Sequence, residues 1–291
     1  MIRKIKKSLE HYSLRDLINR LDIRYGLGRL ECCCSTNWFN PFATLWLNLR
    51  SFPFKQAIAF PIWCYGRPRF YGLSGRMLIK GKVTSGMIRF NQVKYSAPSN
   101  MSLQSEIQNI GLIIFRGKGF IGTGCKIVVG FNAVLDIGKN FKITDMCNIG
   151  CLRKIHIGEQ SRIVHRCQVF DSNYHYVANF SRKIVSNYIR TIHIGKDCWI
   201  CNSSTITGGT VLPDYTIVGS NSLINKDFSD LPQNSMIGGI PAKLITTGVR
   251  RVNNSRIEKE LSHFFKTHPD DMFPIPEHAT PDEYSCVDTF K

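Results

Sequence analysis

A six-residue repeat of aliphatic side chains constrains this chain more than any other feature of its sequence. From residue 194 to 224 every sixth position is aliphatic: Ile194, Ile200, Ile206, Leu212, Val218 and Ile224. A small residue stands four positions after each of the first five members: Cys198, Ser204, Thr210, Thr216 and Ser222. Helices repeat apolar positions every three to four residues and strands every two, so neither explains a period of six. The repeat predicts a coil of short strands.

The period also predicts which residues stack on each other. Three six-residue faces make one turn of 18 residues, so aliphatic residues 18 positions apart lie in successive turns. The predicted pairs are Ile194 with Leu212, Ile200 with Val218, and Ile206 with Ile224. An upstream series follows the same rule and an earlier one is less regular: Ile157, Ile163 and Val169, then Ile137, Ile143 and Ile149. Stacked turns pair their backbones and bury one continuous apolar column.

The repeat is interrupted between Val169 and Ile194. Val169 predicts an aliphatic residue at position 175, but the pattern resumes at 194, so about 19 residues leave the coil. We expect an excursion loop over residues 172–191. Long loops held by a rigid scaffold usually bind or catalyse, and this one contains a single histidine, His175.

The coil is expected to occupy residues 76–248 and to have a flank on each side. Residues 1–75 are expected to form a helical and irregular cap, with an amphipathic helix near the start and several prolines later. Residues 249–291 are expected to form a tail and a short helix, Ser255 to Phe265, packed across the last coil. The predicted fold class is all-β, a parallel β-helix with this cap and this C-terminal helix.

Charge narrows the classes of partner. The chain has 38 lysines and arginines against 21 acidic residues, a net charge of +17, which favours phosphate-rich ligands or anionic surfaces. The sequence contains no helix-turn-helix, zinc-finger or RNP-like pattern, so nucleic acid is not expected. The basic face of residues 2–24 permits peripheral contact with a membrane surface. The longest apolar run, residues 57–65, is far shorter than the roughly 20 residues of a spanning helix.

The eleven cysteines are interpreted as reduced thiols. No cleavable signal segment is apparent, which points to a cytoplasmic protein, with the inner membrane face as the site of any peripheral association. Cys198 and Cys201 have the spacing of half a zinc site, but both lie inside the repeat and no second pair matches. We therefore expect no metal. The run Cys32 to Cys34 has no explanation at this stage.

The order of motifs over residues 120–248 resembles the hexapeptide-repeat acyltransferases, in particular the branch with galactoside and maltose O-acetyltransferases and polysaccharide-modifying enzymes. The resemblance rests on the hexad run, Asp-Ser-Asn-Tyr-His at 171–175, Ile-Gly-Lys-Asp-Cys-Trp-Ile at 194–200, and Gly-Gly-Ile-Pro-Ala-Lys at 238–243. It implies a left-handed parallel β-helix, usually a homotrimer, with acetyl-CoA in the groove between neighbouring prisms.

The resemblance also implies a catalytic set. His175 stands at the position of the family's general base, and imidazole suits that role because its pKa lies near neutrality. Asp171 or Asn173 could orient the ring, and the backbone N–H of Asn202 could stabilise the oxyanion. Cys201 replaces the glycine that follows Trp-Ile in the family, which would narrow the site beside the thioester.

By the same matching, a second set of residues would line the coenzyme A groove. These residues are Trp199, Asn202, Ser220, Asn225, Lys226 and Lys243. Of them, Trp199 would wall the groove and Lys243 would meet the phosphates. Solvent-exposed lysines and coil-corner residues are the simpler interpretation of the same positions.

The predicted function is acetyl-CoA-dependent O-acetylation of a sugar hydroxyl by direct transfer, in cell-surface polysaccharide synthesis, on a saccharide or saccharide-lipid acceptor. Two alternatives stay open. Transfer to the amino group of an amino(nucleotide-)sugar would use the same base and donor, and a non-catalytic β-helix scaffold would need neither. A γ-type carbonic anhydrase requires three zinc-binding histidines with one close pair, a spacing that His156, His165 and His175 lack.

Overall fold

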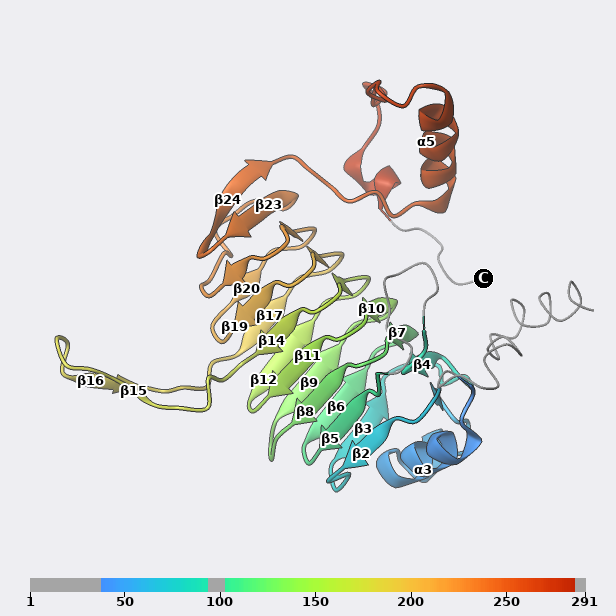
Figure 1. Ribbon diagram of the computed structural model, residues 1–291, viewed down its shortest axis with the longest axis vertical. Coiled ribbons are helices and arrows are strands. Elements are labelled where there is room, and N and C mark those ends of the chain that lie inside the picture. Colours follow the sequence, from blue (N-terminus) through green and yellow to red (C-terminus); the bar gives the residue numbers. More distant parts are fainter. Residues whose placement is uncertain (1–37, 94–102, 286–291) are drawn as a thin grey trace, which may run out of the picture.

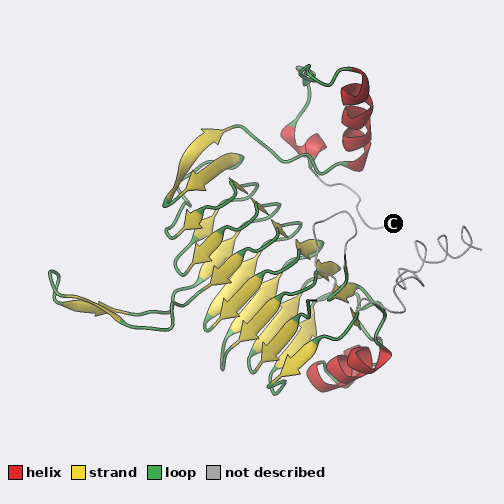
Figure 2. Cartoon of the chain, in the orientation of Figure 1, coloured by secondary structure: helices red, strands yellow, loops and turns green. Residues whose placement is uncertain are grey.

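The computed structural model describes residues 38–93 and 103–285 (Figures 1 and 2). Its body is a coil of short parallel strands that form three sheets, the three faces of a prism. This is the predicted left-handed parallel β-helix with a small C-terminal helix. The predicted amphipathic helix at 2–24 and the Cys32 to Cys34 run lie outside the described residues. No described helix has the length and apolar composition of a membrane span.

Each turn of the coil contributes one strand to each sheet. The first sheet contains β1 (Ile62–Cys64), β4 (Ile88–Phe90), β7 (Gly119–Ile121), β10 (Phe141–Ile143), β13 (Arg162–Ile163), β18 (Trp199–Ile200), β21 (Ile217–Val218), β23 (Ser235–Gly239) and β24 (Ala242–Thr247). The second contains β2 (Arg69–Tyr71), β5 (Glu106–Asn109), β8 (Lys126–Val129), β11 (Asn148–Cys151), β14 (Gln168–Phe170), β19 (Thr205–Thr207) and β22 (Leu223–Ile224). The third contains β3 (Arg76–Ile79), β6 (Leu112–Phe115), β9 (Val134–Ile137), β12 (Lys154–Ile157), β17 (Ile192–Ile194) and β20 (Val211–Leu212).

Helices occupy the two ends of the described chain. They are α3 (Pro41–Ser51), α4 (Phe54–Ala57), α5 (Ser255–Thr267) and a 3-10 helix (Pro281–Tyr284). Strand pairing begins at Ile62, inside the range predicted as the cap. The strands of this first turn pair with strands 26 to 37 residues later, as Ile62 does with Ile88 and Arg69 with Glu106, so they produce no period of 18. Figure 1 places α3 at one end of the prism and the antiparallel β23–β24 hairpin at the other.

The predicted stacking register is confirmed. The three predicted pairs are adjacent partners in the sheets: Ile194 with Leu212, Ile200 with Val218, and Ile206 with Ile224. The upstream series continues the same columns: Ile157 with Ile194, Ile163 with Ile200, and Val169 with Ile206. The six-residue period therefore fixes which residues pair, since each turn is in register with the next.

Earlier turns of the coil are longer, which explains their irregular sequence pattern. Ile137 pairs with Ile157, 20 residues later, and Ile127 pairs with Ile149, 22 residues later. Several of these strands have four residues where later ones have two or three. The columns continue inside the prism although the strict period of 18 is lost.

The corners of the coil explain the small residues of the repeat. A residue with positive φ, such as Ser203 at 59° or Asn221 at 55°, bends the chain, and the small residue after it is buried. Its hydroxyl then bonds to backbone inside the prism, as Ser204 Oγ donates to the Gly219 carbonyl at 2.9 Å. The small residue is thus selected for size and for a hydrogen bond that buried backbone requires.

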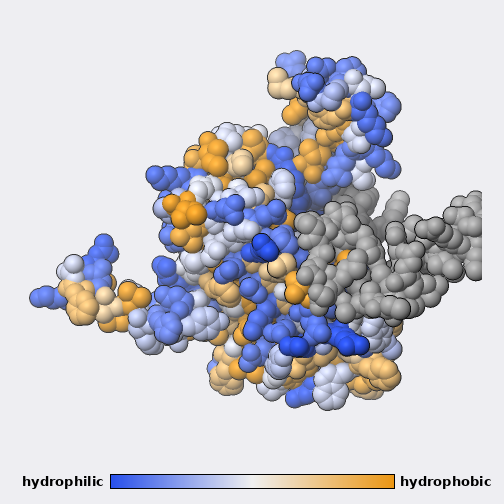
Figure 3. Space-filling view, in the orientation of Figure 1, coloured by the Kyte–Doolittle hydropathy of each residue, from blue (hydrophilic) through white to orange (hydrophobic). Residues whose placement is uncertain are grey.

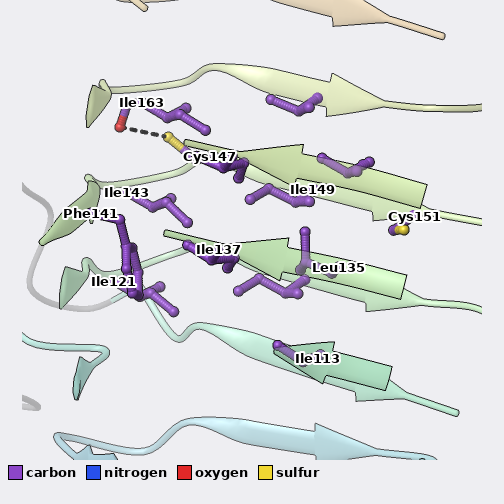
Figure 4. Close-up of a cluster of buried hydrophobic side chains, with 14 of the residues drawn as sticks. Ile113, Ile121, Leu135, Ile137, Phe141, Ile143, Cys147, Ile149, Cys151 and Ile163 are labelled. Carbon is purple, nitrogen blue, oxygen red and sulfur yellow. Dashed lines mark hydrogen bonds between the residues drawn. The ribbon is translucent and has the colours of Figure 1, made fainter. Parts of the chain in front are cut away.

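The core is a column of aliphatic side chains along the prism axis (Figure 4). Ile113, Leu135, Ile155 and Ile192 follow one another in successive turns, and each is at most 1% exposed. Each of these side chains contacts mainly the turns above and below. Its burial therefore joins neighbouring turns of the coil.

The C-terminal helix differs from the prediction in two respects. It runs to Thr267, two residues beyond the predicted end at Phe265, and its N-cap is Asn254, whose side chain accepts from the Arg256 N–H. It does not pack across the last coil: Figure 1 shows α5 standing away from the prism, and Phe264 packs against Phe273 of the same segment. The segment is joined to the coil through Arg251, whose guanidinium donates to Asp197 at 2.9 Å.

We expect Ile155→Ala to lower the free energy of unfolding by about 2–5 kcal/mol, because it leaves a cavity in the column. Chemical denaturation followed by circular dichroism measures this. Lys154→Ala, on the same strand with an exposed side chain, is the matched control and should cost little. Equal losses for both variants would contradict the inward position of Ile155.

Candidate active site

The excursion leaves the coil after β14, at the corner between the second and third sheets. It projects from the prism as a hairpin of β15 (Val177–Asn179) and β16 (Ile184–Ser186) (Figure 1). Asp171 is fully buried at its base, and its carboxylate accepts the backbone N–H groups of residues 152–154 at 2.8–3.0 Å. The Asp171 carboxylate therefore supplies the hydrogen-bond partner for three backbone N–H groups at the corner of the preceding turn, and these bonds hold the start of the excursion.

The two ends of the excursion are joined to each other. The Arg190 N–H donates to the Asp171 carbonyl at 2.8 Å, and Ser172 forms a bridge with Ile189. Gly208 of the next turn crosses directly over this junction. A Cβ there would lie 2.7 Å from the Asp171 carbonyl oxygen and 2.9 Å from that of Arg190, so only glycine fits. The base of the excursion is consequently rigid.

His175 lies on the first turn of the excursion and is exposed. Tyr174, with φ of 63°, donates its N–H to Ser172 Oγ at 2.9 Å, and the His175 N–H faces Asn173 Oδ1 at 3.4 Å. Asn173 thus shapes the backbone of the turn, and Asp171 is committed to the corner. In the described part of the chain, neither predicted partner forms a hydrogen bond with the imidazole ring.

A hollow of about 610 Å³ lies at the base of the excursion beside His175. Two tyrosines stabilise its wall, since Tyr176 and Tyr188 meet edge to face with ring centroids 4.6 Å apart. The lining residues are Phe170, Ser172, Asn173, His175, Val177, Ser186, Asn187, Tyr188, Arg190, Thr207 and Gly208. Sequence reasoning missed Arg190 and Thr207, because only the fold brings the end of the excursion beside β19.

Asn202 lies on a different edge of the prism, at the corner between the first and second sheets. It is exposed, and its carbonyl accepts the Asn221 N–H at 2.9 Å, so Ser220 lies one turn away on the same edge. Trp199 is half-buried in β18 beside Arg162 and Ile217. This edge carries the predicted oxyanion donor and part of the predicted coenzyme A groove.

The two cysteines that flank β18 are poor nucleophiles. Burial raises the pKa of the Cys198 thiol to about 12 and that of Cys201 to about 11, so both stay protonated at neutral pH. Among the described residues, no group of three or more His, Cys, Asp or Glu side chains is arranged to hold a metal ion.

The remaining predicted groove residues lie elsewhere. Asn225 and Lys226 follow β22 and are exposed, on the edge from which the excursion leaves. The Lys226 ammonium lies 5.1 Å from the centroid of the Phe228 ring. Lys243 is exposed on the β23–β24 hairpin that ends the coil. The predicted residues thus form two groups separated by the second sheet.

The width of that sheet decides what one chain can assemble. Six extended residues span at most about 20 Å, which is the scale that separates the corner of Asn202 from the corner of the excursion. The hollow beside His175 does not include Asn202 among its lining residues. A single chain therefore holds the predicted base and the predicted oxyanion donor on different edges.

A second polar cluster lies on the outer surface of the third sheet. His156 of β12 and His193 of β17 are adjacent partners in this sheet, and their rings stack with centroids 4.8 Å apart. Arg116 forms a two-point ion pair with Asp136 at 2.7 Å beside them. Burial and the neighbouring His193 lower the pKa of His156.

Comparison with known proteins supports the resemblance seen in the sequence. No family model matches the chain. It is 25% identical over 147 residues to WbbJ of Escherichia coli K12, whose name gives it an inferred role as a lipopolysaccharide biosynthesis O-acetyl transferase. The alignment covers 48% of this chain and 74% of WbbJ. The chain is 24% identical over 142 residues to the galactoside O-acetyltransferase of the same organism, covering 49% of this chain and 64% of that enzyme.

The chain also has weak similarity to solved structures. The polySia-specific acetyltransferase NeuO is 19% identical, with 72% of this chain and 99% of NeuO covered and a TM-score of 0.35. AntD, an N-acyltransferase from Bacillus cereus solved with dTDP-4-amino-4,6-dideoxyglucose and coenzyme A, is 15% identical, with 71% and 88% covered and a TM-score of 0.39. Because these TM-scores are low, no detail of those structures is transferred to this chain.

The curated relatives confirm the predicted resemblance to hexapeptide-repeat O-acetyltransferases. These relatives are acyltransferases by name, which is the enzyme class that the sequence predicts for this chain. The alignments cover about half of this chain and less than two thirds of the galactoside enzyme.

We expect Asp171→Asn to destabilise the protein by about 2–4 kcal/mol, because an amide has one acceptor oxygen for three backbone N–H groups. Thermal unfolding and chemical denaturation measure this loss. Asp227→Asn, an exposed carboxylate, is the control. Unchanged stability of the Asp171 variant would show that the corner does not depend on this carboxylate.

Proposed function

We propose that this chain is an acetyl-CoA-dependent O-acetyltransferase that acts on a sugar hydroxyl, with His175 as the general base. The observation that carries the proposal is the position of His175. It lies on the rim of a hollow, on an excursion whose base is fixed by Asp171 and Gly208. Both curated relatives are named as O-acetyl transferases, which supports transfer to oxygen.

The proposed reaction is a direct transfer. The His175 imidazole takes the proton of the acceptor hydroxyl while its oxygen attacks the thioester carbonyl carbon. The carbon–sulfur bond then breaks, the acetyl group stays on the sugar oxygen, and the imidazolium returns its proton to the thiolate of coenzyme A. The Asn202 N–H would donate to the oxyanion of the tetrahedral intermediate.

The separation of His175 from Asn202 supports a site shared between subunits. In a closed homotrimer, the excursion of one chain can lie over the Asn202 edge of its neighbour, and threefold symmetry repeats this three times. The hairpin also exposes apolar side chains that such an interface would cover. These are Val177, Phe180, Ile184 and Val185.

The proposed donor groove lies between neighbouring prisms. Trp199, Asn202 and Ser220 would contribute from one edge. Asn225 and Lys226 would contribute from the other, and Lys243 would reach the phosphates from the end of the coil. Exposed ammonium groups suit the phosphates of coenzyme A, because their positive charge attracts the negatively charged phosphates.

The proposed acceptor is a saccharide or saccharide-lipid made on the cytoplasmic side of the membrane during polysaccharide synthesis. Hydroxyl, amide and aromatic groups lining the hollow can bind sugar hydroxyls and faces, and Arg190 adds a positive charge. The same base and donor would serve N-acetylation of an aminosugar. Competition between sugar and aminosugar acceptors distinguishes the two.

His175→Ala is expected to lower kcat by about 10²–10⁴-fold with the fold intact, because the base is removed and the coil is untouched. Release of the coenzyme A thiol in the presence of saccharide acceptors measures turnover, and circular dichroism checks the fold. His278→Ala, an exposed histidine of the C-terminal segment, should retain activity. Full turnover by the His175 variant would refute the assigned base.

Calorimetric titration with acetyl-CoA tests the donor groove. Lys226→Ala should weaken binding by about tenfold through loss of a charge pair with phosphate, whereas Lys259→Ala on α5 should bind as the wild type does. His175→Ala should bind normally, which separates donor binding from catalysis. If the wild type binds no acetyl-CoA, the non-catalytic scaffold becomes the better hypothesis.

A further inference from the structure

Helix α3 turns its apolar side to solvent. Phe42, Leu45, Trp46 and Leu49 have the spacing i, i+3, i+4 and i+7, so they form one stripe. All four are exposed, Phe42 by 80% and Trp46 by 61%. A surface helix of a soluble domain normally presents the opposite arrangement, with its polar side outward.

The inward side of α3 carries Thr44 and Asn48 beside the buried Leu47, and the coil requires these two polar residues. β1 is the terminal strand of its sheet, and its free backbone edge needs hydrogen-bond partners. Asn48 supplies them, since Nδ2 donates to the Ile62 carbonyl at 2.7 Å and Oδ1 accepts the Ile62 N–H at 3.1 Å. Thr44 Oγ1 accepts the Cys64 N–H at 3.0 Å. Rotating the helix to bury its apolar stripe would break all three bonds.

Helix α4 is oriented by the same device. β3 is the terminal strand of the third sheet, and Gln56 bonds with both the N–H and the carbonyl of Ile79 at 2.9 Å. Phe54, 74% exposed, and Ile58 therefore face outward. We call these six side chains the apolar end face: Phe42, Leu45, Trp46, Leu49, Phe54 and Ile58.

Basic residues predominate in the part of the chain that forms the apolar end face. Residues 38–93 contain no Asp or Glu and eight basic residues: Arg50, Lys55, Arg67, Arg69, Arg76, Lys80, Lys82 and Arg89. Arg50 and Lys55 lie on α3 and α4 themselves and are exposed. In Figure 3, pale-orange and blue side chains share the end of the molecule where Figure 1 places α3.

We propose that the apolar end face docks on the surface of a bilayer that contains anionic lipids. Exposed Trp and Phe side chains partition into the interfacial region, and surrounding Lys and Arg are attracted by anionic headgroups. The outward apolar stripe and the flank without acidic residues both fit this occupant. Insertion of the stripe and attraction of the basic residues to the headgroups would each favour binding to the same surface.

Charge argues against two other occupants. A second copy of the end face would bring two uniformly basic surfaces together. Residues 1–37 of the same chain contain eight Lys and Arg against four Asp and Glu, so their net charge has the same sign as the flank. The docking proposal depends on no catalytic assignment, because the end face lies at the opposite end of the coil from Lys243 (Figure 1).

Vesicle flotation with the full chain tests the proposal. Wild type is expected to float with vesicles of phosphatidylcholine and phosphatidylglycerol and to stay behind with phosphatidylcholine alone. The double variant Phe42→Ser, Trp46→Ser should lower the partition coefficient by about tenfold or more, because it removes two exposed aromatic side chains that would insert into the lipid interface. The double variant Met272→Ser, Ile275→Ser removes two exposed apolar side chains from the C-terminal segment and should bind normally.

Three results would overturn the proposal. The first is absence of binding to the anionic vesicles, and the second is unchanged binding of the folded Phe42, Trp46 variant, which would assign binding to another segment. The third is a covered end face in solution without lipid. If sedimentation velocity shows a change in oligomer mass in that variant, a second copy covers the end face. If Trp46 fluorescence, obtained by subtracting the signal of Trp46→Phe, is protected from acrylamide quenching, a segment of the same chain covers it.

Discussion

Backbone pairing between successive turns is the interaction on which the rest of this molecule depends. Each strand bonds to the strands one turn below and above, and the aliphatic column inside makes that pairing favourable. A coil of this kind leaves unpaired strand edges at its two ends. Here the side chains of Asn48 and Gln56 satisfy one end, and the antiparallel β23–β24 hairpin closes the other.

The same constraint decides where function can lie. Residues inside the coil are committed to the column, so a binding segment can leave only at a corner, and this chain does so after β14. Leaving the coil imposes two requirements. The buried Asp171 carboxylate accepts backbone N–H groups at the corner of the turn below, and Gly208 in the turn above has no side chain to clash with the junction. The rigid base in turn gives His175 a defined position beside the hollow.

Capping of the first turn also accounts for the proposed docking surface. The edge of β1 needs polar partners, so α3 directs Thr44 and Asn48 inward and its apolar stripe must face out. The end face and the excursion are therefore consequences of one architecture, the first at its end and the second at a corner. A bilayer at the end face would not cover the corner from which the excursion leaves.

The sequence by itself determined the coil, its stacking register in the later turns and the exit of His175, because a strict period sets each residue's neighbours without further information. It did not determine the hydrogen bonds from the backbone of residues 152–154 to Asp171, the separation of His175 from Asn202, or the position of α5 away from the prism. Those features depend on contacts between residues far apart in the chain. Only the tertiary structure decided which edge each corner occupies and which side of α3 meets the coil.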